Sequence, residues 1–521
     1  MLQQDTRGEE RQQIAVTAEQ MRAIESRVFA AGMPVAALME KVGLRIADRV
    51  QQLYPCSQAP QVGILAGPGH NGGDALVVAR ELHFRGYGVR LCLPLLKLKQ
   101  LTAAHADYAK SLGIACDRTP NFQSCDLLID GLFGFGLTRS LSGELADLVN
   151  EINGLNRPIV SIDLPSGLHT DTGEVLGTAI CATHTLCLGL WKATFLQDRA
   201  LAYAGTAELI DFDLPLVDVR AVPTELRRIV PPVALEALPL PRPTETHKYQ
   251  QGHVLLVCGS RQYTGAAILA GLGARASGVG MLSIAVPESL KSLLAAQLPE
   301  ALVLGCAETE GGAIATLPET LNLSNYDTIA CGPGLTPSAI AVVDRILDST
   351  IPLLLDADGL NILAAQQWIP RLQQRSTFTT ITPHPGEFRR LFPHLAEQLG
   401  YRTQVAALAA QQSNLTLVLK GARVAIAHPQ GPVWVNPDST PALARGGSGD
   451  VLTGLMGGLL AQAQSSHPDS SDTTVLEGRV CAAVWWHAQA GILAAQEKTE
   501  LGVDAFTLSQ YLSPVLSNWM A

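Results

Sequence analysis

Short apolar runs alternate with helix-length amphipathic segments along most of this chain, and this alternation constrains its fold more than any other feature. In the first half, six runs have the length and residue types of buried strands: 61–66, 88–93, 125–130, 158–163, 183–190 and 207–212. Strands that alternate with helices are typical of a parallel sheet covered by helices on both faces. We therefore predict a three-layer α/β/α domain over residues 14–215.

The alternation restarts after a proline-rich stretch, so the sequence predicts a second domain. Because proline fixes φ and removes a backbone donor, we expect residues 216–244 to form an extended linker. The strands expected after it are 253–258, 280–286, 326–331, 352–356, 378–382 and 415–420, followed by an antiparallel hairpin at 423–428 and 432–436. Long apolar helices are expected at 450–464 and 475–496, with a polar loop at 465–473 between them. These elements predict a second α/β/α domain over residues 245–515.

The net charge and the length of the apolar runs argue against a nucleic-acid-binding or membrane-spanning protein. The 521 residues include 37 Lys and Arg against 47 Asp and Glu, a formal net charge of −10, whereas a nucleic-acid-binding face is basic. No apolar run reaches the roughly 18 residues that a membrane-spanning helix requires. The first 15 residues are too charged for a signal peptide, and the ten cysteines form no CxxC pair. We therefore expect a cytoplasmic protein with reduced thiols, without nucleic acid or membrane as a partner.

A glycine-rich loop follows the first predicted strand. Residues 67–74 read GPGHNGGD, which matches GxGxxG between a strand and a helix. Glycine lets the backbone approach a phosphate group, and the amides of a helix start face the anion. Hydride-transferring dinucleotide domains also carry an acidic residue at the end of the second strand, and residues 90–94 (RLCLP) contain none. The loop therefore indicates phosphate binding without ordinary hydride transfer, with a plain tight turn as the alternative.

Two more predicted strands end in an aspartate. Asp130 precedes the glycine-rich segment 131–139, and Asp163 precedes Leu-Pro-Ser-Gly, which contains Ser166. Because the carboxyl ends of parallel strands line the ligand crevice of such a sheet, we expect both carboxylates to lie beside the first loop. Either aspartate alone has a second interpretation as a simple helix cap, but their common placement favours a shared site.

These motifs, with the segments TAEQMRAIE and ALMEKVG, resemble the epimerase domain of the NAD(P)HX repair family, which acts on hydrated NADH and NADPH. The resemblance covers residues 14–215 and implies a Rossmann-like fold with Asp163 as the acid/base residue. It implies that the hydrated nucleotide binds to His70, Asn71, Gly72, Gly73, Asp74, Gly134, Phe135, Gly136, Leu137, Thr138, Arg139, Ser140 and Asp163. It also implies K⁺ ligands at Asn71, Asp130 and Ser166, whose oxygen atoms suit a hard cation.

The strongest local signal of the second half is the run GGSGD at residues 446–450, which precedes an apolar helix. Backbone amides at such a helix start can hold phosphate charge, and glycine permits close approach. Asp450 is placed to take a proton from an attacking hydroxyl, and the alternative is a helix-starting charge favoured by the helix dipole. The pattern GxxxxGK[ST] occurs nowhere in the chain, which excludes P-loop chemistry.

The GGSGD run resembles ribokinase-like small-molecule kinases, and further segments narrow the resemblance. They are HK at 247–248, TGAA at 264–267, CGPGL at 331–335, DAD at 356–358 and TPHPGEF at 382–388. Over residues 245–515 these segments resemble the ADP-dependent NAD(P)HX dehydratase domain. The resemblance implies hydrated-nucleotide contacts at Ala266, Gly334, His384 and Asp450. It implies ADP contacts at Lys420, Gly421, Ala422, Arg423, Val424, Gly446, Gly447, Ser448 and Gly449.

A few residues depart from the two family patterns, or have a competing interpretation. The departures are Lys41, His70 and Ala75 in the first half, and Tyr249 and Arg445 in the second. We expect His70 to alter contacts to the substrate and Arg445 to alter nucleotide affinity. A lone histidine is more often structural, but the TPHPGEF match favours a ligand contact for His384.

Together the resemblances imply a bifunctional repair enzyme, an isomerase joined to a lyase. One domain would exchange the R and S forms of the hydrated cofactor, with K⁺. The other would transfer phosphate from ADP to the C6 hydroxyl of the S form, with Mg²⁺, and then eliminate phosphate to restore NADH or NADPH. The alternatives are a ribokinase-like kinase for a vitamin precursor, which releases its phosphorylated product, and a non-enzymatic nucleotide sensor or scaffold. We also expect a homo-oligomer.

Overall fold

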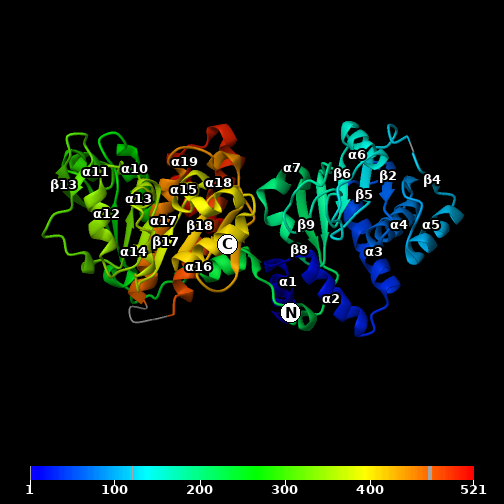
Figure 1. Cartoon of the computed structure of the whole chain (residues 1–521), viewed down its shortest axis with the longest axis horizontal. Coiled ribbons are helices and arrows are strands. Elements are labelled where there is room, and N and C mark those ends of the chain that lie inside the picture. The colour runs from blue at the N-terminus through cyan, green and yellow to red at the C-terminus, as the bar shows by residue number, and fades with distance from the viewer. Residues whose placement is uncertain (1, 120, 467–471, 521) are drawn as a thin grey trace. The chain divides into compact units, whose positions relative to one another are not determined.

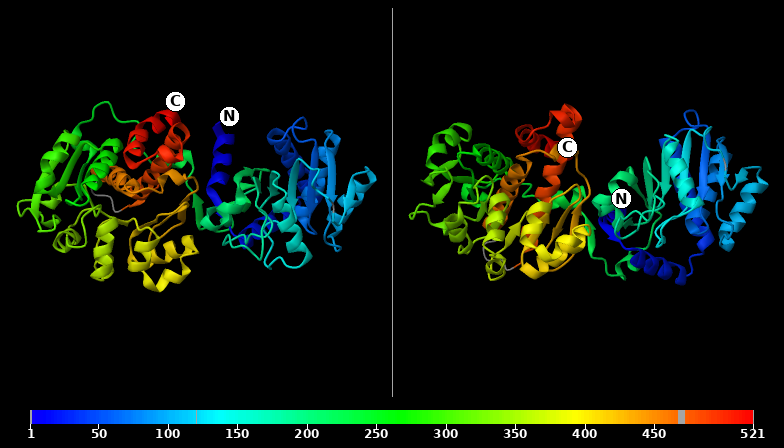
Figure 2. Two further views of the ribbon diagram at one scale, coloured as in Figure 1. Left: turned by 90° about the horizontal axis from the view of Figure 1, so that it is seen from above. Right: turned by 45° about the horizontal axis from the view of Figure 1, so that its top comes forward.

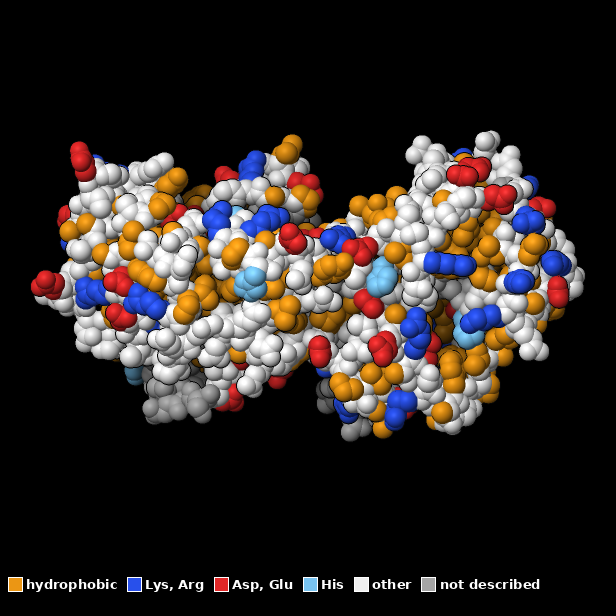
Figure 3. Space-filling view, in the orientation of Figure 1, with side chains coloured by type: hydrophobic (Ala, Val, Ile, Leu, Met, Phe, Trp, Pro, Cys, Tyr) orange, Lys and Arg blue, Asp and Glu red, His pale blue; other side chains and the backbone are white. Residues whose placement is uncertain are grey.

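The computed structural model describes residues 2–119, 121–466 and 472–520, and side chains from residue 8 onwards. The chain divides into two compact units, Met1–Arg228 and Ile229–Ala521 (Figure 1). In these described stretches, no helix combines the length and the apolar character needed to cross a bilayer. On the face seen in Figure 3, Lys and Arg side chains are interspersed with acidic and apolar ones.

The first unit is built on a parallel sheet, which Figure 2 shows from two directions. Its strands lie in the order β4–β3–β2–β5–β6–β7–β9, and each neighbouring pair is parallel. Their bounds are Gln61–Ala66 (β2), Gly88–Cys92 (β3), Ala115–Asp117 (β4), Leu127–Gly131 (β5), Ile159–Ile162 (β6), His184–Leu188 (β7) and Thr206–Ile210 (β9). All six strands predicted for this half are present, and β4 is an additional edge strand.

Helices cover both faces of this sheet, and side chains from a single strand pack in two different hydrophobic cores. In β2, Val62 and Ile64 pack in one core, while Leu65 packs in a second core with Val149 and Ile152. The helices of the first core are α2 (Ala18–Ala30), α3 (Val35–Leu53), α4 (His70–Phe84), α5 (Gln100–Ser111) and α8 (Leu216–Arg220), and that of the second is α6 (Glu144–Gly154). The remaining helices of the unit are α1 (Leu2–Gln13) and α7 (Leu201–Ala204).

The second unit contains a longer mixed sheet, in the order β14–β13–β12–β11–β15–β16–β17–β18–β19–β20. The pairs from β13 to β18 are parallel, and the three terminal pairs are antiparallel. The strands are His253–Val257 (β11), Met281–Pro287 (β12), Leu302–Glu308 (β13), Ile314–Thr316 (β14), Thr328–Cys331 (β15), Leu353–Leu355 (β16), Thr379–Ile381 (β17), Thr416–Leu419 (β18), Val424–Ala427 (β19) and Val433–Asn436 (β20). The six predicted strands and the predicted hairpin are present, whereas β13 and β14 were not predicted.

Glycine lets two helices of this unit touch through their backbones. A Cβ on Gly454 would lie 1.8 Å from the carbonyl oxygen of Ala270, and one on Gly273 would lie 2.1 Å from that of Val451. The unit's helices are α9 (Pro231–Glu236), α10 (Thr264–Ser277), α11 (Lys291–Gln297), α12 (Ile340–Leu347), α13 (Ala357–Ala365), α14 (Ile369–Gln373), α15 (Pro385–Leu391), α16 (Arg402–Ser413), α17 (Ser448–Ser466), α18 (Thr474–Lys498) and α19 (Ala505–Met520). The two predicted long helices correspond to α17 and α18, and most of the loop predicted between them lies outside the described residues.

Residues 216–244 contain regular structure, so the prediction of an extended linker is wrong. In the first unit, α8 is followed by β10 (Leu226–Arg228), which pairs with β1 (Ile14–Val16); β1 in turn pairs with β8 (Trp191–Lys192). In the second unit, Ala234 of α9 is fully buried. Proline is tolerated in the first turn of a helix, where its missing N–H has no intrahelical acceptor, so a high proline content does not exclude a helix.

Candidate active sites

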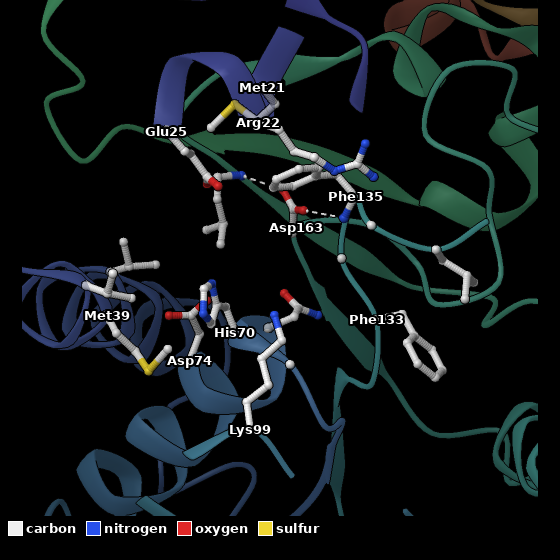
Figure 4. Close-up of a pocket in the computed structure, with 18 of the residues that line it drawn as sticks. Met21, Arg22, Glu25, Met39, His70, Asp74, Lys99, Phe133, Phe135 and Asp163 are labelled. Atoms are coloured by element: carbon white, nitrogen blue, oxygen red, sulfur yellow. Dashed lines mark hydrogen bonds between the residues drawn. The ribbon is translucent and has the colours of Figure 1, made fainter. Parts of the chain in front are cut away.

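A cavity of about 530 Å³ opens at the carboxyl edge of the sheet in the first unit (Figure 4). Its wall comes from α2, α3, the loop before α4, the loop after β5 and the ends of β6 and β7. The predicted substrate-binding residues in this wall are His70, Asn71, Asp74, Gly134, Phe135, Gly136, Leu137, Thr138, Arg139 and Asp163. The loops after three parallel strands therefore converge on one opening.

Three residues of the predicted set lie outside the cavity wall. Gly72 and Gly73 are buried in the first turn of α4. A Cβ on Gly72 would lie 1.9 Å from the carbonyl oxygen of Gly67, and one on Gly73 would lie 2.6 Å from the sulfur of Met39. These glycines therefore let α4 pack against the loop and against α3. Ser140 is exposed at the end of its loop.

Asp163 is fixed in the cavity wall by its backbone and by its partners. Its φ of +67° is in the left-handed region, which aspartate tolerates better than most residues, and its side chain is almost fully buried. Oδ2 accepts a hydrogen bond from the backbone amide of Phe135 at 2.9 Å. Oδ1 lies 2.5 Å from Nζ of Lys192, which also donates to the carbonyl oxygen of Leu188 at 2.6 Å. The carboxylate is therefore held in one position with its charge balanced.

Lys192 is a site residue that the sequence analysis missed. Burial disfavours its charged form, but the carboxylate of Asp163 outweighs burial, and the pKa of Lys192 is raised. Its partner lies on a different strand, and only the tertiary structure brings the two together. The available signal was a lysine within the apolar run GLWKATF, because a buried lysine is rarely found without a partner.

Two further carboxylic acids face the same cavity, Glu25 from α2 and Asp74 from α4 (Figure 4). Burial raises the pKa of Glu25 to about 7; Lys192 opposes this shift and Asp163 adds to it. Burial also raises the pKa of Asp74 well above its ordinary range, with repulsion from Asp163 and Glu25 adding to the effect. Burial and these two neighbouring acids therefore favour the protonated form of Asp74, in which it can donate a hydrogen bond. Glu25 was not among the predicted site residues.

Asp130 and Ser166 lie beneath the cavity rather than in its wall. The hydroxyl of Ser166 donates to Oδ1 of Asp130 at 2.6 Å, while the Ser166 amide and the Ser161 hydroxyl each donate to Oδ2 at 2.8 Å. Burial raises the pKa of Asp130, although these hydrogen bonds act in the opposite direction. The amide Nδ2 of Asn71 is buried without a hydrogen-bond partner. Carboxylate, hydroxyl and amide oxygens are donors that fit a hard cation such as K⁺.

The departures in the first unit have different structural settings. Lys41 forms an ion pair with Asp213 at 2.8 Å, away from the cavity wall. Ala75 is buried, and a Cβ added to Gly131 would lie 2.4 Å from the Cβ of Ala75. Only His70 lines the cavity, and burial, followed by the charge of nearby Lys99, lowers its pKa.

In the second unit, Asp450 lies in the first turn of α17, beside the residues that follow β16 and β18. A Cβ on Gly449 would lie 3.5 Å from Nζ of Lys420 and 3.7 Å from Oδ2 of Asp356. Burial raises the pKa of Asp450 to about 7, with repulsion from Asp356 adding and Lys420 opposing. Gly447 has a φ of +91°, and a Cβ there would lie 2.5 Å from the side chain of Leu269.

Asp356 is the buried centre of this second site. Its Oδ1 accepts a hydrogen bond from Nζ of Lys420 at 2.6 Å, and its Oδ2 accepts one from the hydroxyl of Thr453 at 2.7 Å. Lys420, a predicted ADP contact, therefore stands between a buried carboxylate and the glycine-rich turn. The DAD motif was recognised in the sequence, but no role was assigned to Asp356, because its partners are 64 and 97 residues away.

His384 begins α15 and has a clear structural role. Its Nδ1 accepts a hydrogen bond from the amide of Gly386 at 2.9 Å, and its own amide donates to Glu387 at 2.8 Å. Burial lowers the pKa of His384, and the charge of Lys420 adds to this effect. Half of its side chain is exposed, which leaves it open to a ligand.

The other predicted contacts of the second unit lie in its loops. Gly334 has a φ of +65°, and a Cβ there would lie 2.8 Å from that of Ala266. Gly421 and Ala422 are exposed, Arg423 and Val424 are half-buried, and Gly446 has open space around it. Buried Ser448 accepts a hydrogen bond through its carbonyl oxygen from Nε2 of His487 at 2.9 Å. The departures Arg445 and Tyr249 are both exposed.

Comparisons with known proteins match each unit separately and the chain as a whole. A family model described as NAD(P)H-hydrate dehydratase matches residues 254–514, and one described as YjeF-related protein N-terminus matches residues 35–194. The bifunctional NAD(P)H-hydrate repair enzyme Nnr of Synechocystis sp. is 54% identical over 97% of this chain and 95% of its own length. The protein of that name from Thermosynechococcus vestitus is 52% identical over 97% of this chain and 98% of its own.

A solved structure is similar to about half of this chain. It is an ADP/ATP-dependent NAD(P)H-hydrate dehydratase from Bacillus subtilis, co-crystallized with ATP/Mg²⁺. It is 35% identical, covers 54% of this chain and 94% of its own, and gives a TM-score of 0.44.

Proposed function

This chain belongs to the family of bifunctional NAD(P)H-hydrate repair enzymes, with an epimerase domain and a dehydratase domain. We propose which of its residues carry out each of the two reactions. The first unit exchanges the R and S forms of the hydrated cofactor at C6. The second unit dehydrates the S form at the expense of ADP. The observation that carries the proposal is one aspartate in each unit, Asp163 and Asp450, placed beside glycine backbone at the carboxyl edge of its sheet.

In the first unit, Asp163 accepts and returns a proton of the C6 hydroxyl. The ion pair with Lys192 keeps the carboxylate charged, and the amide of Phe135 orients it. The glycine-rich loop from Gly134 to Arg139 forms part of the cavity wall and provides room for the nicotinamide ring. Burial raises the pKa of Asp74, so its protonated form is favoured and can donate a hydrogen bond to a polar group of the substrate.

We assign K⁺ to the oxygen atoms of Asn71, Asp130 and Ser166. The adjacent oxygen atoms of Asp130 and Ser166, joined by a hydrogen bond of 2.6 Å, support this assignment. A bound cation would fix the loop after β5, which follows Asp130 and contains much of the cavity wall.

In the second unit, Asp450 removes the proton of the C6 hydroxyl, and the hydroxyl oxygen attacks the terminal phosphorus of ADP, releasing AMP. The amides of the turn from Gly446 to Gly449 and the charge of Lys420 stabilise the transferring phosphoryl group. Phosphate then leaves from C6 as a proton is lost from C5, which restores the ring double bond. This route is chemically reasonable because phosphate is a much better leaving group than hydroxide.

We propose Mg²⁺ at this second site, bound mainly by the nucleotide phosphates, with Asp356 and Asp358 nearby as carboxylate donors. Mg²⁺ is usually held through one or two carboxylates and substrate phosphates rather than by an all-protein cage. When bound, the ion would neutralise phosphate charge. We also expect a cytoplasmic homo-oligomer.

The test is turnover of hydrated NADH by the purified chain, with ADP and ATP compared. Recovery of the reduced-nicotinamide absorbance supports repair, and accumulation of a phosphorylated product would instead identify a kinase. An Asp450→Asn variant that binds nucleotide normally, together with no turnover by the unmodified chain, would identify a nucleotide sensor.

A further inference from the structure

We propose that Glu25 is a second catalytic acid–base residue of the epimerase site, acting on the ring nitrogen while Asp163 acts on the hydroxyl. The proposal rests on the assignment of epimer exchange to the first unit. Glu25 belongs to α2, which is separate from the loops after β2, β5 and β6 that the glycine-rich motifs predicted as the site.

The placement of Glu25 is fixed by its helix. Thr17 and Gln20 form a reciprocal cap at the start of α2, where the Thr17 amide donates to Oε1 of Gln20 at 2.8 Å. Met21, Glu25 and Phe29, spaced four residues apart, form one stripe of this helix, and all three line the cavity. The stripe turns the carboxylic acid of Glu25 towards the opening that Asp163 also faces (Figure 4).

The surroundings of Glu25 leave it available to a ligand. The charged and titratable groups that act on it are Lys192, Asp163 and Arg22, and it in turn acts on Asp74. Lys192 is already engaged by Asp163 and by a carbonyl oxygen. Among the residues that the structure describes, none forms a hydrogen bond or an ion pair with the carboxyl group of Glu25.

The three acids of the cavity therefore differ in how readily each one binds and releases a proton. The carboxylate of Asp163 is paired with the ammonium group of Lys192, which places it to act as the base. Burial raises the pKa of Asp74, and repulsion from Asp163 and Glu25 adds to this shift, so its protonated form is favoured. Glu25, whose pKa is raised to about 7 by burial, can both give a proton and take it back at neutral pH.

These properties fit a ring-opening reaction. The C6–N1 bond breaks while Asp163 accepts the hydroxyl proton and Glu25 donates its proton to N1, so that C6 becomes an aldehyde carbon. Rotation about the C5–C6 bond turns the opposite face of the aldehyde towards N1. The C6–N1 bond then re-forms as N1 returns its proton to Glu25 and Asp163 returns one to the oxygen. Both residues finish in their starting states, and no other reactant is consumed.

The test measures epimer exchange in the full chain without ADP, starting from one purified epimer of hydrated NADH and following the other by chromatography. Glu25→Gln removes the proton donor at constant size and is expected to slow exchange roughly 100-fold or more. Glu25→Asp keeps a titratable acid and should recover part of the rate. The matched control is Glu19→Gln, an exposed glutamate of the same helix, which should exchange like the unmodified chain.

The pH profile separates catalysis from a structural role. Exchange by the unmodified chain should fall above about pH 7, as Glu25 loses its proton, and this fall should be absent in Glu25→Gln. Exchange by Glu25→Gln within twofold of the unmodified chain, with the same pH profile, would overturn the proposal. No exchange by the unmodified chain itself would overturn the assignment of the first unit on which the proposal rests. ADP-dependent dehydration of the S form, unchanged in each variant, reports an intact second unit.

Discussion

An aspartate at the edge of a sheet takes its chemical character from the groups packed around it. Asp163 lies against a buried lysine, whereas Asp450 lies near a second carboxylate, that of Asp356. In the first environment a positive charge stands beside the carboxylate. In the second, burial raises the pKa of Asp450 to about 7, and repulsion from Asp356 adds to this shift, so that its basic form is lost as the pH falls through 7.

This difference predicts the pH dependence of dehydration. Asp450 acts as a base only when it is deprotonated, so the rate should rise about tenfold per pH unit below pH 7 and level off above it. The measurement is kcat/KM for the S form at saturating ADP, recorded at several pH values from roughly 5.5 to 8.5.

The corresponding variant is Asp450→Asn, which should stop dehydration and leave epimer exchange unchanged. Asp438→Asn, which alters an exposed aspartate of the same unit, serves as the control and should retain both activities. Unchanged dehydration in Asp450→Asn would remove this residue from the reaction.

At the scale of elements, the backbone contact between α10 and α17 supports the second site. Gly454→Ala would place a methyl group 1.8 Å from the carbonyl oxygen of Ala270, and neither backbone can move without shifting its helix. We expect this variant to lower the free energy of unfolding of the second unit by about 3 kcal/mol.

Thermal unfolding, followed by the loss of dehydration activity, would measure this decrease in the stability of the second unit. Gly265→Ala is the matched control, because it lies on α10 and a Cβ there meets nothing within 4 Å. It should unfold at the temperature of the unmodified chain or slightly above it, since alanine is the better helix former. Equal stability of the two variants would contradict the close-packing interpretation.

Elements with strong periodicity were predictable from the sequence, and short elements that depend on tertiary pairing were not. Strands such as β2 and β15 are apolar runs of ordinary length, and helices such as α17 carry a long apolar pattern. In contrast, β8 has two residues, and β1 and β10 three each, too few for any periodicity. Their pairing is decided by partners about 180 to 210 residues apart in the sequence.

The candidate sites were predictable to the extent that their residues lie in glycine-rich motifs. Asp450 ends such a motif, and Asp163 ends a predicted strand next to one; the structure places each beside its expected loop. Lys192, Glu25 and Asp356 do not, because their importance arises from partners on other elements. A single sequence records an ion pair only as two separate residues.

For the whole molecule, the two sites act in sequence on one pool of substrate. In Asp163→Asn, the asparagine retains the left-handed backbone and loses the base, so only the first activity should fail. An equal mixture of epimers with ADP should then be consumed in two phases, a fast one for the S form and a slow one at the spontaneous rate of epimer exchange. Equal rates for both epimers would show that Asp163 is not required.

Gly134 lies where the two loops of the first site come closest. A Cβ there would lie 2.8 Å from Oδ2 of Asp163 and 3.2 Å from Oδ1 of Asn71. Even the smallest side chain would thus press on the side chains of Asp163 and Asn71 at once. Among natural variants of this enzyme, we expect that position to admit a single residue type, so that a change there marks a copy whose epimer exchange has been lost.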